Sequence, residues 1–171
     1  MALSPTRQKR LQRQGFVGLD DNLLNEIGPW TRFSTSLCAI LMGIGTILAS
    51  PSVLLVAMAT ALLGTILPFH PFDLLYNYGV RHMTGTRPLP PNPIQRRFAC
   101  GIATLWLGGT FWAFSAGALI VGYVLGGILT AVALLVSTTD ICIPSLVYGL
   151  MFGKLAGCNT EEGKARPAGR V

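Results

Sequence analysis

Charged residues are scarce in this sequence, and two long stretches lack them altogether. Only 12% of the 171 residues are charged, and residues 33–72 and 98–139 contain no Asp, Glu, Lys or Arg. An average soluble domain is about 25% charged, with charged side chains along every exposed element. The composition therefore argues against a soluble domain and favours the lipid bilayer as the solvent for these two stretches.

The sequence also lacks the motifs that mark common catalytic and metal sites. It contains no Gly-rich phosphate loop, no HExxH and no GxSxG, and no two of its four cysteines stand in CxxC spacing. No ionisable residue is expected deep in an apolar stretch, whereas pumps and ion pathways usually need one there. We therefore expect no enzymatic activity, no cofactor and no metal, and we assign no catalytic residue.

Two breaks divide the charge-free stretches into four apolar segments. A turn signal falls at residues 50–52 (Ser-Pro-Ser), and the second stretch breaks best at 115–117 (Ser-Ala-Gly). The fold predicted from this pattern is all-α, with four transmembrane helices arranged as two hairpins. Each helix of the first hairpin is about 15 residues long, and a full span needs about 20. Whether residues 35–67 cross the membrane completely therefore stays open.

Basic residues flank the apolar segments and set the predicted topology. They precede the first segment, occupy the central loop and follow the last segment, and neither turn contains one. A topology with both termini in the cytoplasm places all 13 on the cytoplasmic side. We expect a multi-pass protein of the bacterial cytoplasmic membrane that contacts anionic headgroups and binds no nucleic acid. The residues expected at headgroup depth are Trp30, Arg32, Arg81, Arg96 and Arg97.

The regions outside the hairpins are predicted to lie in the cytoplasm or at the membrane surface. A short helix with Asp20 at its N-cap is expected at residues 19–28, and apolar spacing over 70–83 predicts an amphipathic surface helix that His70 could cap. Asp73, Asn77 and Arg81 would form its polar face. We interpret Asp73 and Asp140 as helix-terminal residues at the cytoplasmic surface. The predicted segments are 1–32, the hairpin 33–67, the loop 68–97, the hairpin 98–137, an interfacial or re-entrant segment 138–155 and a disordered tail 156–171.

Small residues recur at every fourth position of the last apolar segment, which is typical of close helix contact. The face serves either packing within the four helices or contact with another chain, which would be another membrane subunit or a second copy. The matching groove is expected in the preceding segment. The residues concerned are Ala118, Gly122, Gly126, Gly127 and Thr130, with Gly101, Gly108 and Gly109 as the groove.

Three cysteines are predicted at one level of the membrane. Cys38, Cys100 and Cys142 all fall near the cytoplasmic boundary, and Cys158 lies in the tail. Clustering at one level suggests metal binding or thiol transfer. The absence of ligand spacing instead favours three small apolar side chains that fill space.

Part of the sequence resembles a known family. The motifs that show the resemblance are FHPFDLLYNY at 69–78, RHMTGT at 81–86, PPNP followed by RRFAC at 90–100, and DICIPSLVY at 140–148. They are similar to an uncharacterised bacterial family of small four-helix integral membrane proteins, a domain of unknown function. The resemblance covers most of residues 30–150 and implies a membrane location without supplying an activity. The family pattern often has a second cysteine where this chain has Ser145, which weakens a dithiol mechanism.

Three functions are compatible with the sequence, in this order of preference. The first is a non-enzymatic accessory, scaffold or assembly subunit of a larger membrane complex. The second is a thiol- or sulfur-handling membrane protein that uses Cys100 and Cys142. The third is a channel or carrier for a small neutral solute, formed by an oligomer.

Overall fold

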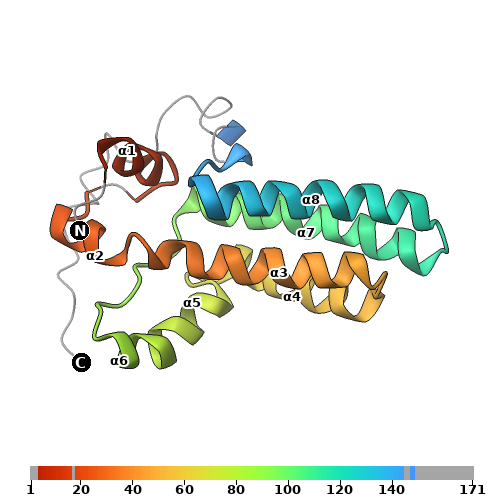
Figure 1. Cartoon of the computed structure of the whole chain (residues 1–171), viewed down its shortest axis with the longest axis horizontal. Helices are drawn as coiled ribbons and strands as arrows, with labels where there is room; N and C mark the ends of the chain where they lie inside the picture. The colour runs from red at the N-terminus through yellow and green to blue at the C-terminus, as the bar shows by residue number, and fades with distance from the viewer. Residues whose placement is uncertain (1–3, 17, 145–146, 149–171) are drawn as a thin grey trace.

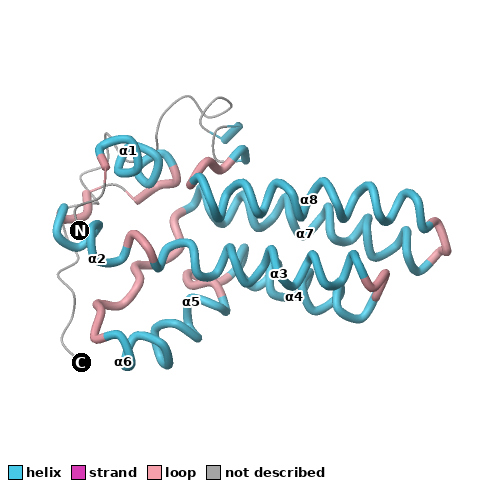
Figure 2. The backbone as a smooth tube through the Cα atoms, viewed as in Figure 1, coloured by secondary structure: helices cyan, strands magenta, loops and turns pink. Residues whose placement is uncertain are grey.

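Four long helices lie side by side, and shorter helices gather at one end of them (Figures 1 and 2). This computed structural model describes residues 4–16, 18–144 and 147–148, and within them it contains helices and loops but no strand. The all-α prediction is therefore confirmed. The long helices are α3 (Phe33–Ile47), α4 (Pro51–Ile66), α7 (Ile94–Ser115) and α8 (Leu119–Thr139).

Proline and positive φ angles define the ends of these helices. Pro51 begins α4 and Pro93 is the N-cap of α7, positions at which a missing backbone N–H costs little. Gly117 has a φ of +76° in the turn between α7 and α8, a conformation that glycine adopts without steric cost. Both turns fall where the sequence predicted them.

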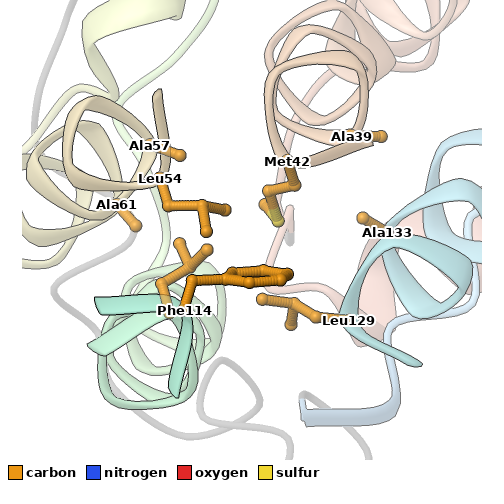
Figure 3. Packing of buried hydrophobic residues seen from close by; sticks show 9 residues of the cluster. Ala39, Met42, Leu54, Ala57, Ala61, Phe114, Leu129 and Ala133 are labelled. Atoms are coloured by element: carbon orange, nitrogen blue, oxygen red, sulfur yellow. The ribbon is translucent and has the colours of Figure 1, made fainter. Parts of the chain in front are cut away.

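The four long helices form a bundle in which each contacts two neighbours, in the cyclic order α3, α4, α7 and α8. Side chains from all four converge on one apolar core (Figure 3). Large side chains such as Met42, Leu54 and Phe114 meet small ones such as Ala39 and Ala133, so the layers interdigitate.

Only part of this bundle is long enough to cross a membrane. Helices α7 and α8 have the length and hydropathy of membrane spans. Helix α4 qualifies only if it is joined to the helix at residues 71–84, from which it is bent by 85°. Helix α3 has 15 residues and is too short by itself. The structure therefore shows two clear candidate spans, and the prediction of four rests on further argument.

The end that carries the short helices, called here the short-helix end, is formed partly by the N-terminal region. It contains α1 (Pro5–Arg13), α2 (Asp21–Ile27) and a 3-10 turn, η1 (Trp30–Arg32). Helix α2 matches the helix predicted at 19–28, although the Asp20 side chain at its N-cap makes no capping hydrogen bond. Helix α1 was not predicted because its sequence is almost entirely polar. It is held by a small cluster of Leu11, Phe16 and Leu24.

The loop between α4 and α7 also folds into helix, as predicted, but the side of this helix that faces the protein differs from the predicted one. It comprises α5 (Pro71–Leu75), a π-helical turn η2 (Tyr76–Val80) and α6 (Arg81–Thr84). His70 caps it, because its Nδ1 accepts the Phe72 N–H at 3.3 Å.

The predicted polar face of this helix is wrong. Asp73 is buried, and the Asn77 side chain bonds to the backbone of Leu89, whereas Tyr78 and Met83 are exposed. The π turn changes the angular spacing of the side chains, and the sharp bend after α4 turns Asp73 and Asn77 toward the protein.

Two adjacent glycines of α8 provide a matched test of this packing. A Cβ on Gly126 would lie 2.6 Å from Thr46 Cγ2, whereas a Cβ on Gly127 would meet nothing within 4 Å. We expect Gly126→Ala to lower the free energy of unfolding by about 1–3 kcal/mol through overpacking. Gly127→Ala should leave it unchanged or raise it by roughly 1 kcal/mol through helix propensity. Thermal unfolding in mild detergent measures both, and equal melting temperatures would show that α8 does not pack on α3 here.

Candidate functional site

A cavity of about 340 Å³ lies between α3, α7 and α8 at the short-helix end of the bundle. All three cysteines of the described chain line it, and none of them forms a disulfide. Each thiol comes from a different part of the sequence. Cys38 lies in α3, Cys100 in α7, and Cys142 follows the end of α8. We call this space, with its polar wall residues His70 and Arg96, the thiol cavity.

His70 lies beside the Cys38 thiol. Its Nε2 lies 3.7 Å from Cys38 Sγ. On the α4 side, a Cβ placed on Gly64 would lie 3.1 Å from His70 Nε2 and 3.3 Å from Cys100 Sγ. The imidazole thus contacts Cys38, and both the ring and the Cys100 thiol lie against Gly64. Gly64 leaves the space that the ring occupies, and a larger residue there would push the ring or the Cys100 side chain away.

Burial gives this imidazole a defined protonation state. The side chain is 4% exposed, and burial lowers the pKa of His70 to about 4. Asp73 raises this pKa in part and Arg96 lowers it. The ring is therefore neutral near pH 7. Because Nδ1 accepts the Phe72 N–H, the hydrogen-bond pattern assigns the proton to Nε2, the atom nearest Cys38. His70 can thus donate a hydrogen bond to a negatively charged sulfur.

Arg96 brings a positive charge to the cavity wall. Its Nη2 donates to Ser34 Oγ at 2.8 Å and to the Thr31 carbonyl at 3.4 Å, and its guanidinium lies 5.7 Å from the centre of the Phe16 ring. These partners are all neutral. Within the described residues, no carboxylate lies within ion-pair distance of Arg96. The cavity therefore has a half-buried cation on its wall whose charge is not neutralised by a direct partner.

A buried carboxylate fastens the N-terminal region beside the cavity. Asp140 ends α8 with a φ of +57° and is 3% exposed. It accepts from Arg7 Nε at 2.9 Å and from Arg32 Nε at 2.7 Å, with a second bond from Arg32 Nη2. This hydrogen bonding raises the pKa of Arg32. Arg10 also donates to the Thr139 carbonyl and Gln14 to that of Asp140. Gln14 in turn lines the cavity.

The predicted small-residue face lies within the chain. A Cβ on Gly122 would lie 2.7 Å from the Phe114 ring, and Gly126 packs against Thr46. The expected groove is elsewhere, because Gly101 faces Thr65 and Gly108 faces Met58, both of α4. The remaining positions are Gly109, which faces Leu125, Ala118, which is the N-cap of α8, Thr130, whose Cγ2 faces Gly43, and Gly127, which is open.

Several residues expected at the headgroups have partners inside the protein. Trp30 stacks on Tyr76 with ring centres 5.1 Å apart. Arg97 donates to the carbonyls of Thr65 and Ile66, the last of α4. Arg32 binds Asp140, Arg96 lines the cavity, and Arg81 begins α6. Asp73 and Asp140 both lie at helix ends as predicted, Asp73 in the first turn of α5 and Asp140 at the end of α8, but the expected surface position is wrong, since both are buried.

Sequence reasoning placed the three thiols at one level but missed the residues around them. His70 was predicted only as a cap, and Arg7 and Gln14 were not singled out. One available signal was the isolated Asp140, the first charge after a long apolar run. Ser145, residues 149–155 and the tail with Cys158 lie outside the described residues. No group of three or more His, Cys, Asp or Glu in the described part is arranged to hold a metal ion.

The fold and the cavity define a small all-helical protein in which at least two helices are suited to a membrane. The chain belongs to the family described as Domain of unknown function (DUF4395), whose model matches residues 28–152. The predicted resemblance to an uncharacterised family is thereby confirmed. No curated protein and no solved structure matches the chain.

The Asp140 contacts can be tested with Asp140→Asn. Asn tolerates the same left-handed backbone but leaves the two arginines without an anionic partner. We expect the free energy of unfolding to fall by about 2–4 kcal/mol, because Asp140 is buried, and α1 to become sensitive to protease. The matched control is Glu26→Gln at the exposed pair with Arg87, which should barely change stability. Equal effects of the two variants would show that Asp140 does not hold α1.

The buried imidazole predicts a pH dependence. The pKa of His70 is lower in the folded chain than its ordinary value of 6.5, so the unfolded chain binds more protons between about pH 4 and 6.5. The stability contributed by neutral His70 is complete above about pH 6.5 and is lost toward pH 4, by up to about 3 kcal/mol. His70→Asn, which can still cap α5, should flatten this slope in denaturation curves. The exposed His82, replaced likewise, is the control, and an unchanged slope in His70→Asn would refute the assignment.

Proposed function

We propose that the chain is an integral protein of the bacterial cytoplasmic membrane, with four membrane helices and both termini in the cytoplasm. Apolar side chains such as Ile47 of α3 and Ile66 of α4 are exposed on the short hairpin, as lipid contacts require. Helix α3 continues directly from η1, which lengthens its helical run. The basic residues of the described chain all belong to the short-helix end, away from the two turns (Figure 1), and this supports the orientation.

We propose further that the protein handles a small molecule through the thiols of this cavity. The observation that carries the proposal is the convergence of Cys38, Cys100 and Cys142 on one open space. Cysteines that only fill space would be surrounded by close-packed neighbours, since protein interiors contain few voids larger than a water molecule. Here the three thiols instead line a partly open space large enough for a small organic molecule.

The cavity also contains groups that suit thiol chemistry. The His70 Nε2–H points to the Cys38 sulfur and can stabilise negative charge on it. Arg96 adds a positive charge to the same wall. A thiolate is the reactive form of cysteine, and the charge of Arg96 favours it, whereas the apolar surroundings of Cys38 and Cys100 favour the neutral thiol. These side chains are suited to binding and holding a thiol-reactive or sulfur-containing molecule, and no turnover is required of them.

The accessory-subunit hypothesis loses one of its supports. It relied on the small residues of α8, and Gly122 and Gly126 are covered by Phe114 and Thr46 of the same chain. Gly127 alone among the glycines of this face meets nothing within 4 Å. Contact with other membrane subunits therefore remains a prediction from the sequence. The solute-channel hypothesis likewise gains no specific observation.

Alkylation in native membranes tests the thiol proposal. In a chain carrying Cys158→Ser, we expect the neutral reagent iodoacetamide to modify the cavity thiols without denaturant, and His70→Asn to slow the reaction of Cys38 most. The matched control is Ala57→Cys in a chain whose cavity cysteines are Ser, because Ala57 is buried in the core and does not line the cavity. Peptide mass mapping reports each site. Cavity thiols that react as slowly as the residue at position 57 would be space-filling side chains, and the proposal would fail.

A further inference from the structure

The thiol cavity is an elongated slot with two chemically different ends. On α7 its lining runs from Arg96 to Trp106, and on α8 from Val136 to Ile128. At 1.5 Å per residue, the α7 part extends for about 15 Å along the bundle. Its polar end holds Arg96, His70 and Gln14, whereas its far end is formed by Trp106 and Ile128. A ligand that matches both ends must itself be amphipathic.

The polar end favours a negatively charged ligand group. Among the residues that the structure describes, Arg96 donates only to the neutral oxygens of Ser34 and Thr31, and one of these bonds is long at 3.4 Å. Asp140 is already engaged by Arg7 and Arg32. Asp73, although its charge acts on His70, is not within ion-pair distance of Arg96. A guanidinium beside apolar surface without an anionic partner marks a site for an anion, and its fork of N–H groups matches a carboxylate.

The apolar end limits what can follow the anionic head. Trp106 uses its indole N–H on the Leu125 carbonyl at 3.0 Å, so this part of the wall offers the ligand no free donor there. Ile128 and Val132 are also apolar. The volume of about 340 Å³ is at the low end for small-molecule sites and is too small for a two-chain lipid. A single unbranched chain of medium length fits this space.

We propose that the thiol cavity binds a single-chain amphipathic carboxylate, with the head at Arg96 beside the three thiols and the chain between α7 and α8 toward Trp106. This inference rests on the proposed function and names the class of molecule that the cavity receives. The arrangement agrees with the proposed membrane position, because the head lies at the boundary level and the chain at hydrocarbon depth.

Quenching of Trp106 by a bromine-labelled ligand tests the proposal. The protein is reconstituted in nanodiscs whose scaffold protein lacks tryptophan, with Trp30→Phe and Trp112→Phe, so that Trp106 is the only tryptophan in the sample. The probe is 11-bromoundecanoate, and the matched neutral probe is 11-bromoundecanol, both at about pH 9, where the carboxylate is ionised. We expect saturable quenching by the carboxylate with an apparent affinity about tenfold higher than that of the alcohol.

Variants at the adjacent residues Arg96 and Arg97 test which arginine causes the preference for the carboxylate over the alcohol. Arg96→Gln should abolish it and Arg96→Lys should retain part of it. Arg97→Gln, at a side chain that caps α4 and does not line the cavity, should leave it intact. Equal quenching by carboxylate and alcohol in the unsubstituted arginine background would overturn the proposal without reference to any variant's folding. Retention of the full preference in Arg96→Gln would overturn it as well.

Iodoacetamide labelling in the same nanodiscs separates this inference from the proposed function. Reactive thiols together with no carboxylate preference would overturn the ligand class alone. Unreactive thiols together with a preference that depends on Arg96 would support an amphiphile site and overturn the thiol function. Protection of the thiols by undecanoate, and not by undecanol, is the result expected if both hold.

Discussion

The buried Asp140 carboxylate is the contact on which the short-helix end of this molecule depends. It ends α8, and it receives arginines from α1 and from the turn before α3. These three segments are distant in the sequence, and the hydrogen bonds from Arg10 and Gln14 to the carbonyls of Thr139 and Asp140 and from Arg7 to the Gly28 carbonyl join them further. A single carboxylate can serve both arginines because it has two oxygens and about four lone-pair sites. The cations also sit at the C-terminal end of α8, where the helix dipole favours positive charge.

The wall of the cavity beside Asp140 depends on how the His70 ring is accommodated among the long helices. Helices α4 and α7 pack closely, and Gly64 admits the His70 ring between them and α3. The ring is fixed by two constraints, its capping bond to Phe72 and its approach to Cys38. The imidazole is thereby both a structural cap and part of the cavity wall. Both ring nitrogens therefore contact protein atoms, although the histidine is buried and receives no hydrogen bond from solvent.

Much of the bundle could be predicted from the sequence, and most of the site could not. Charge-free stretches and turn signals located the four long helices, because burial in lipid or protein demands apolar side chains throughout. The level of Cys38, Cys100 and Cys142 followed from counting along those helices. The burial of Asp73 and Asp140 did not, because it depends on a π turn and on contacts with a polar N-terminal helix. Neither leaves a periodic signal in the sequence, and Arg7 is separated from Asp140 by 133 positions.

The unequal lengths of the two hairpins have a consequence for the surrounding bilayer. Helix α7 extends for about 33 Å and α4 for about 24 Å, measured at 1.5 Å per residue. In the proposed membrane position, lipids beside α3 and α4 would meet a hydrophobic height several ångströms below that beside α7 and α8. Such one-sided mismatch is relieved by local thinning of the membrane or by tilting of the whole protein, each at a modest cost per ångström. The protein would thus be favoured in thinner regions of its membrane. The hydrocarbon layer that a polar solute must cross would be thinner on the α3–α4 side.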